Sequence, residues 1–178
     1  MKIINTDFKD LFLFEPVINT DNRGEFVEIF RKNILNELIS YDIDFCQYNR
    51  VKSVKKTLRG LHYQVHPFSQ SKLISVSHGK ILDVVVDLRK TSKSYGKYFS
   101  IELSSQKNNV LFVPKGFAHG YITLSETAIV DYKVDNYYNK DYERGIAFND
   151  PYLDIDWQIE NEDFIISKKD KFFKNHNW

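Results

Sequence analysis

Two short segments of this 178-residue chain combine residue types that can move protons and bind anions. The segment TLRGLHYQ (57–64) places Arg59 and His62 three positions apart around a glycine, and PKGFAHGY (114–121) presents His119 after a Pro-x-Gly turn. A histidine exchanges protons near neutral pH, and an arginine binds phosphate oxygens. Positions 59 and 62 of a regular strand face opposite sides, so a bulge at the glycine is needed to bring both side chains to one site.

The same histidines do not predict a metal site. The histidine-rich metal site of small β-barrels needs a His-x-His pair followed at short spacing by a carboxylate, and here the sequence reads His62-Tyr63-Gln64. The chain also carries no Gly-x-Ser-x-Gly elbow, phosphate-binding loop or dinucleotide fingerprint. We therefore expect neither a metal nor a cofactor.

Composition excludes several classes of protein. The formal charge is +1, so no overall basic field exists to attract nucleic acid, and we expect no nucleic-acid partner. A single cysteine, Cys46, excludes an intrachain disulfide, and we expect it to be a small buried apolar residue. The N-terminus has no apolar core like that of a signal peptide, and the apolar runs are short. These features predict a cytoplasmic protein with no membrane partner.

Short segments rich in β-branched and aromatic residues predict the strands that position these side chains. They are separated by turns at 78–79, 94–96 and 115–116, and they comprise 72–77, 80–88, 98–103, 109–113, 120–124 and 127–134. Many short strands at close spacing predict an all-β sandwich or barrel, with its site in the mouth and one domain spanning 1–178. A helix is expected over 31–40, and the tail 160–178 is expected to be either a short helix or an arm packed on the barrel.

Two further clusters have structural interpretations of their own. The segment DNRGEFVEIF (21–30) predicts a hairpin with solvated charges, since Arg23-Gly24 forms a turn. In IVDYKVDNYY (129–138), Tyr132 lies within a strand and Tyr138 at its end, where tyrosines are most often structural.

Taken together and in order, the motifs resemble the dTDP-4-dehydrorhamnose 3,5-epimerase family over about residues 11–170. The segments that carry the resemblance are 21–30, CQYN (46–49), 57–64, QSKLISVSHGKILDVVVDLR (70–89), SYG (94–96), VPKGFAHGY (113–121), YKVDNYY (132–138), ERGIAFNDP (143–151) and SKKD (167–170). The resemblance implies a cupin-like jelly roll (a double-stranded β-helix) with a few short helices. It also implies a homodimer that works without a metal.

The family chemistry requires a base, an acid and a cation. The ketone at carbon 4 of a sugar acidifies the hydrogens on carbons 3 and 5, so removal of one proton gives an enolate that is reprotonated on the opposite face. The resemblance assigns His62 as the base, Asp170 as the carboxylate that orients it and Tyr132 as the opposite acid. It assigns Lys72 as the cation near the keto oxygen.

The resemblance also assigns the groups that bind substrate. Arg23 and Arg59 are matched to diphosphate-binding arginines, and His119 to a histidine of the same pocket. Gln47 and Asn49 are matched to positions that contact the nucleotide sugar. Tyr138 and Glu28 are matched to positions near the nucleobase. Asp83 is matched to a buried acid that steers His62. Two of these have competing structural interpretations: Asp83 as the partner of a backbone turn, and Glu28 as a solvated charge.

Departures from the family pattern leave the exact substrate open. Arg50 replaces a small polar residue, HPFSQ (66–70) replaces a proline-rich loop, and both are expected to border the pocket. We expect an epimerase that inverts carbon 3, carbon 5 or both in a nucleoside-diphosphate 4-keto-6-deoxy sugar of the dTDP type. The alternatives are a GDP- or CDP-linked hexose or heptose substrate, a 3,4-ketoisomerase, and a non-catalytic nucleotide-sugar-binding cupin. The combination of Lys72, Tyr132 and Asp170 favours epimerisation.

Overall fold

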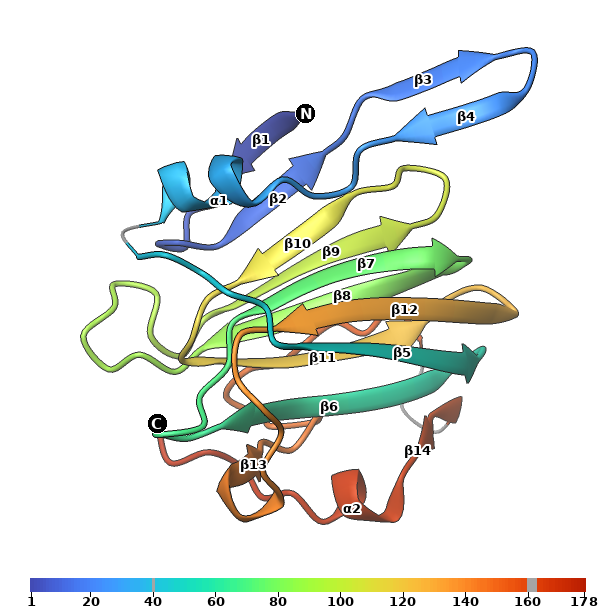
Figure 1. Ribbon diagram of the computed structural model, residues 1–178. Coiled ribbons are helices and arrows are strands. Elements are labelled where there is room, and N and C mark those ends of the chain that lie inside the picture. The colour runs from blue at the N-terminus through green and yellow to red at the C-terminus, as the bar shows by residue number, and fades with distance from the viewer. Residues whose placement is uncertain (40, 160–162) are drawn as a thin grey trace.

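Two β-sheets stack face to face in the computed structural model, which describes residues 1–39, 41–159 and 163–178 (Figure 1). The first sheet has the strand order β1 (Lys2–Asn5), β2 (Phe12–Glu15), β10 (Val110–Val113), β7 (Lys72–His78), β12 (Thr127–Val134) and β5 (Gln47–Val54). The second has the order β13 (Glu143–Gly145), β6 (Thr57–Gln64), β11 (Phe117–Thr123), β8 (Lys80–Asp87) and β9 (Tyr98–Ser104). This is the expected cupin-like jelly roll.

The main core lies between the two sheets. Alternate residues of the inner strands meet there, among them Ile74, Val85 and Val130, each fully buried. Strand β8 is buried along nearly its whole length because its other face, with Val84 and Val86, packs under the C-terminal part of the chain. Burial on both faces explains the continuous apolar run that predicted this strand.

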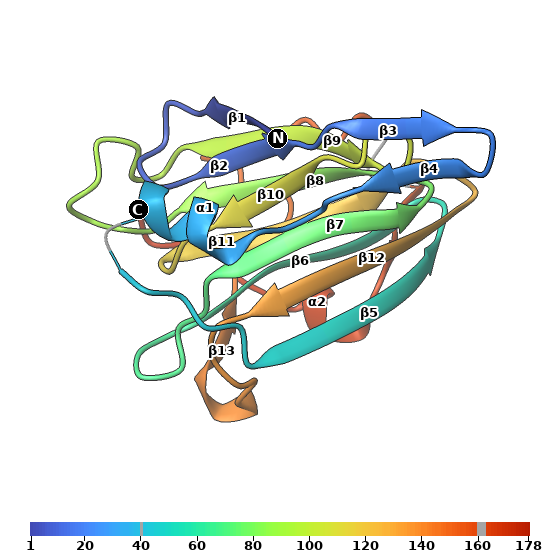
Figure 2. The same cartoon turned by 45° about the horizontal axis from the view of Figure 1, so that its top comes forward.

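Short elements cover the outside of the sheets. Helix α1 (Lys32–Leu38) buries Leu35 against the outer face of the first sheet. A 3-10 turn, η1 (Lys140–Tyr142), precedes β13. The hairpin of β3 (Ile18–Asp21) and β4 (Gly24–Val27) projects beyond the body of the molecule (Figures 1 and 2). No helix in the described part of the chain is long and apolar enough to cross a membrane.

The tail combines both structures that the sequence left open. Strand β14 (Ile165–Ile166) runs parallel to β6, and helix α2 (Lys168–Lys171) follows at once. The chain then continues in an extended path over the second sheet. Ser40 of the expected helix and residues 160–162 of the tail lie outside the described residues.

The six strands and the helix predicted from sequence are present, with small shifts at their ends. The expectation for Cys46 was wrong, because its side chain is exposed. Cys46 lies just before β5, the last strand of the first sheet, so β12 contacts it on one side only, through the backbone oxygen of Val134.

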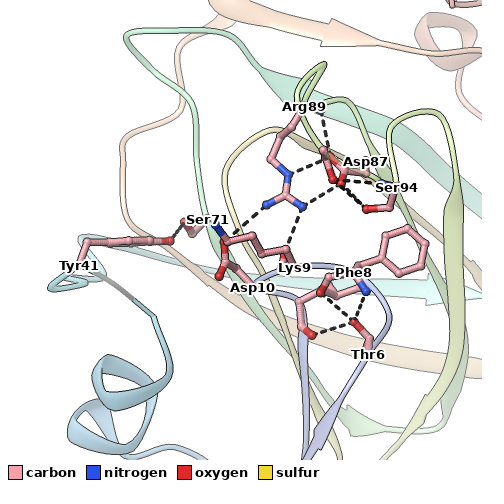
Figure 3. A network of polar contacts seen from close by, with 11 residues as sticks. Thr6, Phe8, Lys9, Asp10, Tyr41, Ser71, Asp87, Arg89 and Ser94 are labelled. Atoms are coloured by element: carbon pink, nitrogen blue, oxygen red, sulfur yellow. Dashed lines mark hydrogen bonds and ion pairs between the residues drawn. The ribbon is translucent and has the colours of Figure 1, made fainter.

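A polar network lies at the end of β8 (Figure 3). Asp87, at the end of β8, accepts hydrogen bonds from Arg89 Nε at 2.9 Å and from Ser94 Oγ at 2.7 Å. The same guanidinium donates to the backbone oxygen of Lys9 at 3.0 Å. The network ties the loop after β8 to the N-terminal segment.

Candidate active site

A cavity of about 720 Å³ opens between the two sheets. It is walled by strands of both sheets and by the tail. Most of the polar residues expected from sequence line it, namely Arg59, His62, Lys72, His119, Tyr132, Tyr138 and Asp170.

A bulge in β6 brings Arg59 and His62 to the same wall. His62 lies opposite His119 of β11, whereas Arg59 lies opposite Tyr121, so three steps on β6 match two steps on β11. The extra residue restores an even spacing, and both side chains therefore face the cavity. Gly60 makes this possible: its φ is +114°, and a Cβ there would lie 2.6 Å from the Cα of Gly120. The bulge predicted from the spacing of Arg59 and His62 is therefore present.

His62 is paired with a carboxylate from the tail. Its Nε2 lies 2.9 Å from Asp170 Oδ1, and Asp170 Oδ2 accepts a hydrogen bond from the Gly60 amide at 3.2 Å. Burial opposes ionisation of Asp170, but the hydrogen bonds from His62 and Gly60 outweigh it and lower the pKa of the carboxyl group. Asp170 is therefore an anion at neutral pH, and it lies behind an imidazole that is 26% exposed.

A second histidine–carboxylate pair consists of His119, which lines the cavity, and Asp83, which is fully buried behind it. His119 Nε2 is 2.8 Å from Asp83 Oδ2, and burial lowers the pKa of His119 although Asp83 opposes that shift. The expectation that Asp83 steers His62 was wrong: β11 lies between β8 and β6, so Asp83 reaches the histidine of the intervening strand. Among the described residues, Asp83 Oδ1 has no hydrogen-bond partner.

Lys72 and Tyr132 face His62 from the opposite sheet. They lie on the adjacent strands β7 and β12 of the first sheet, whereas His62 lies on β6 of the second. Burial lowers the pKa of Lys72 to about 8, although Asp83 and Glu143 favour its charged form. Burial also raises the pKa of Tyr132, so the phenol keeps its proton. Tyr132, which holds a proton, thus faces His62, which can accept one, across the cavity.

Two charged residues of the cavity lining, Glu143 and Lys169, escaped the sequence analysis. Glu143 accepts hydrogen bonds from Lys169 Nζ at 2.8 Å and from Tyr138 Oη at 3.0 Å, at one edge of the cavity. Both belong to segments that carried the resemblance, so the signal was present in the motifs. Their side chains were not selected because nothing local distinguishes them from solvated charges.

A family model described as dTDP-4-dehydrorhamnose 3,5-epimerase matches residues 5–177. The chain belongs to this family. It is therefore related to isomerases that act on carbohydrates, and curated relatives bear the same name. Those from Shigella flexneri and Escherichia coli K12 are 41% and 39% identical, each over 96% of this chain and over 93% and 92% of their own lengths.

Solved structures of a dTDP-4-dehydrorhamnose 3,5-epimerase and of a dTDP-6-deoxy-D-glucose-3,5-epimerase have the same fold. The enzyme from Elizabethkingia anophelis is 43% identical with a TM-score of 0.95, covering 98% of this chain and 96% of its own. The enzyme from Legionella pneumophila, solved in complex with dTDP-4-keto-L-rhamnose, is 40% identical with a TM-score of 0.92, covering 98% and 92%.

In this epimerase-family chain, Gln47 and Asn49 line a smaller adjoining cavity of about 260 Å³. Gln47 Nε2 donates to Asn49 Oδ1 at 2.9 Å, and Gln47 Oε1 accepts from the amide of Tyr138 at 3.1 Å. Gln70, from the loop that departs from the family pattern, lines the same space. Arg50 is in the lining of neither cavity, contrary to expectation. Successive side chains of β5 alternate in direction, and Arg50 pairs with Asp131 instead, at 2.6 Å.

The structure does not bring Arg23 and Glu28 to the cavity of their own chain. Arg23 lies in the turn of the β3–β4 hairpin, where it pairs with Asp21 and its side chain is 86% exposed. Glu28 follows β4 and pairs with Arg31. Neither is among the described residues that line the cavity of His62.

Proposed function

We propose that this protein inverts carbons 3 and 5 of a dTDP-linked 4-keto-6-deoxyglucose. The observation that carries the proposal is the placement of His62 and Tyr132 on opposite walls of one cavity, with Lys72 beside them. The dTDP-4-keto-L-rhamnose bound to the Legionella relative supports the same class of substrate.

The first step transfers a proton from carbon 3 or carbon 5 to His62. An ionised Asp170 accepts the Nε2 proton of His62, so the lone pair on Nδ1 is the basic site. The electron pair of the broken C–H bond moves toward the carbon 4 oxygen, where the ammonium of Lys72 stabilises the enolate. Tyr132 then donates its phenolic proton to the opposite face of the same carbon and the ketone re-forms. Exchange with water returns a proton to Tyr132 and removes one from His62.

The nucleotide needs cationic and aromatic groups outside this acid–base set. We assign Arg59 to the diphosphate, because its guanidinium lines the cavity and Ser53 Oγ holds its Nε at 3.1 Å. Tyr138, Gln47 and Asn49 are assigned to the nucleotide and its sugar, and His119, with Asp83 behind it, to the floor of the pocket.

We further propose that the protein is a homodimer in which Arg23 and Glu28 complete the site of the other copy. The β3–β4 hairpin exposes Phe26 at 70% and Val17, just before it, at 59%. A groove of about 600 Å³ lies on the outer face of the first sheet, and Val27 and Phe30 form part of its wall. Exposed apolar residues next to a groove are typical of a surface that another chain covers.

A cytoplasmic location, expected from the sequence, stays a prediction that subcellular fractionation tests.

A single-centre epimerase is the second candidate. A 3'-monoepimerase from Streptomyces bikiniensis has the same fold with a TM-score of 0.88, at 28% identity. The greater identity to 3,5-epimerases, 43% for the Elizabethkingia enzyme, favours inversion of two centres.

Proton NMR in D₂O tests the proposal. Purified protein is mixed with dTDP-4-keto-6-deoxyglucose, and the signals of the hydrogens on carbons 3 and 5 are followed. Loss of both signals supports the proposal, and loss of one identifies a single-centre enzyme. If neither exchanges, GDP- and CDP-linked 4-keto sugars, heptoses included, are the next substrates. If none of these exchanges, the protein is a nucleotide-sugar-binding cupin.

A further inference from the structure

The chain downstream of Asp170 is fastened to the barrel at points outside the cavity. The amide of Ala147 donates to the backbone oxygen of Lys174 at 3.0 Å. Asp150, only 2% exposed, accepts a hydrogen bond from the amide of His176 at 2.8 Å and from Trp178 Nε1 at 3.3 Å. We call residues 173–178 the C-terminal strap.

Aromatic packing reinforces these hydrogen bonds. The indole of Trp178 stacks on Tyr152 with ring centroids 4.9 Å apart, and a Cβ on Gly96 would lie 3.2 Å from that indole. At the other end of the strap, the ring of Phe173 meets His62 edge-on, with centroids 5.5 Å apart. The same ring lies so close to Gly145 that a Cβ there would overlap it. Phe173 therefore fills the space between β13 and the imidazole.

The elements that carry Asp170 are too short to hold it in place. Helix α2 has 4 residues and β14 has 2, and neither length is stable without packing against something larger. Upstream, the ion pair of Lys56 with Asp163 is exposed, and such pairs contribute little. Phe164 and Ile166 also pack against the core there, but both are only partly buried. The fully buried polar anchor is therefore downstream, at Asp150.

We propose that Asp150 is a positioning residue for proton transfer, which fastens the C-terminal strap so that Asp170 and Phe173 stay in contact with His62. The proposal rests on the assignment of His62 and Asp170 as the base and its partner. Asp150 is not among the described residues that line either cavity, so its effect on the site is indirect. Besides the strap, its Oδ1 holds the amide of Tyr152, the residue on which Trp178 stacks, at 2.9 Å.

A double-mutant cycle tests whether Asp150 acts through Asp170. The variants are Asp150→Ala, Asp170→Asn and their combination, each assayed for kcat and for the Kd of dTDP. The matched control is Asn109→Ala: Asn109 is also buried and also ties a turn, between β9 and β10, by hydrogen bonds to Ser104 and Glu102. It controls for loss of stability without touching the strap. Should Asp150→Ala not fold, Trp178→Phe removes one hydrogen bond to Asp150 and keeps an aromatic ring.

We expect Asp150→Ala to lower kcat by about tenfold or more, because small misplacements of a catalytic group have effects of this size. The Kd of dTDP is expected to stay within about twofold, since the arginines that bind diphosphate are untouched. In the Asp170→Asn background, Asp150→Ala should change kcat by less than about twofold, because the group that it positions is already lost. Trp178→Phe should lower kcat in the same direction, to a smaller extent.

Two results would overturn the inference. One is a kcat for Asp150→Ala equal to that of the Asn109→Ala control, and the other is multiplication of the Asp150 and Asp170 effects in the combined variant. If Asp170→Asn alone retains full kcat, the assigned role of the pair fails instead. The ¹H resonance of the His62 Nε2 proton then still shows whether Asp150 keeps the pair together: its persistence in Asp150→Ala contradicts the strap, and its loss supports it.

Discussion

At the scale of single residues, Asp170 determines which nitrogen of His62 is free to accept a proton. We expect His62→Asn to lower kcat by at least about 10²–10⁴-fold, because it removes the general base. Binding of dTDP should survive, since Arg59 is unchanged. Isothermal titration calorimetry with dTDP and the exchange of substrate hydrogens in D₂O measure the two effects separately. Retained turnover in this variant would contradict the assignment.

We predict that Lys72 sets the alkaline limit of activity. Its pKa is lowered to about 8 because burial disfavours the ammonium, although Asp83 and Glu143 favour it. The enolate needs the charged form, so kcat should fall as the pH rises through about 8. Burial raises the pKa of Tyr132, so loss of its proton occurs at higher pH and does not produce this limb.

The pH profile of Lys72→Met checks this explanation. The variant should have a low kcat and lose the alkaline limb, whereas Lys72→Arg keeps a charge that does not titrate in this range. An unchanged limb in Lys72→Met would mean that another group titrates there.

At the scale of elements, the bulge of β6 determines that Arg59 and His62 face the same cavity. Gly60 and Gly24 both have φ values reserved for glycine, +114° and +126°, but only Gly60 has backbone atoms where a Cβ would lie. Gly24→Ala should therefore cost about 1–2 kcal/mol from backbone strain. Gly60→Ala should cost a further ~1–3 kcal/mol from overlap with Gly120 and His119. Equal losses in urea unfolding would show that the close approach of β6 to β11 is unimportant for stability.

The strands predicted from sequence all contribute to the core. Strands β7 to β12 have apolar residues on the face between the sheets, and this pattern is visible locally. Strand β5 lacks it, because Ser53 faces inward to meet Arg59 and Tyr121 while Lys52 and Val54 are exposed. Strands β13 and β14 have 3 and 2 residues and exist only through pairing with β6. Such strands have no local signal to read.

At the scale of the whole molecule, the order of the strands determines which carboxylate pairs with which histidine. The resemblance assigned both Asp170 and Asp83 to His62; the structure places Asp170 there but Asp83 against His119, so the motifs did not give the full pairing of carboxylates with histidines. That pairing follows from the order β6–β11–β8, and from a tail that returns Asp170 to β6. Arg23 and Glu28 were expected in the pocket, but the structure places them in and after an exposed hairpin, a placement on which the motif gives no information.

Mixing two inactive variants tests whether the hairpin serves the other copy. In a twofold dimer with exchanged arms, a pair of Arg23→Ala with His62→Asn contains one site with both changes and one with neither. Random reassortment makes half of the dimers mixed, so the mixture should recover about a quarter of wild-type activity. The assay uses substrate well below KM, where loss of a diphosphate contact has its full effect. If each hairpin served its own chain, both sites of every mixed dimer would be defective, and the mixture would show only the average of the two parents. A monomer by sedimentation would exclude the shared site outright.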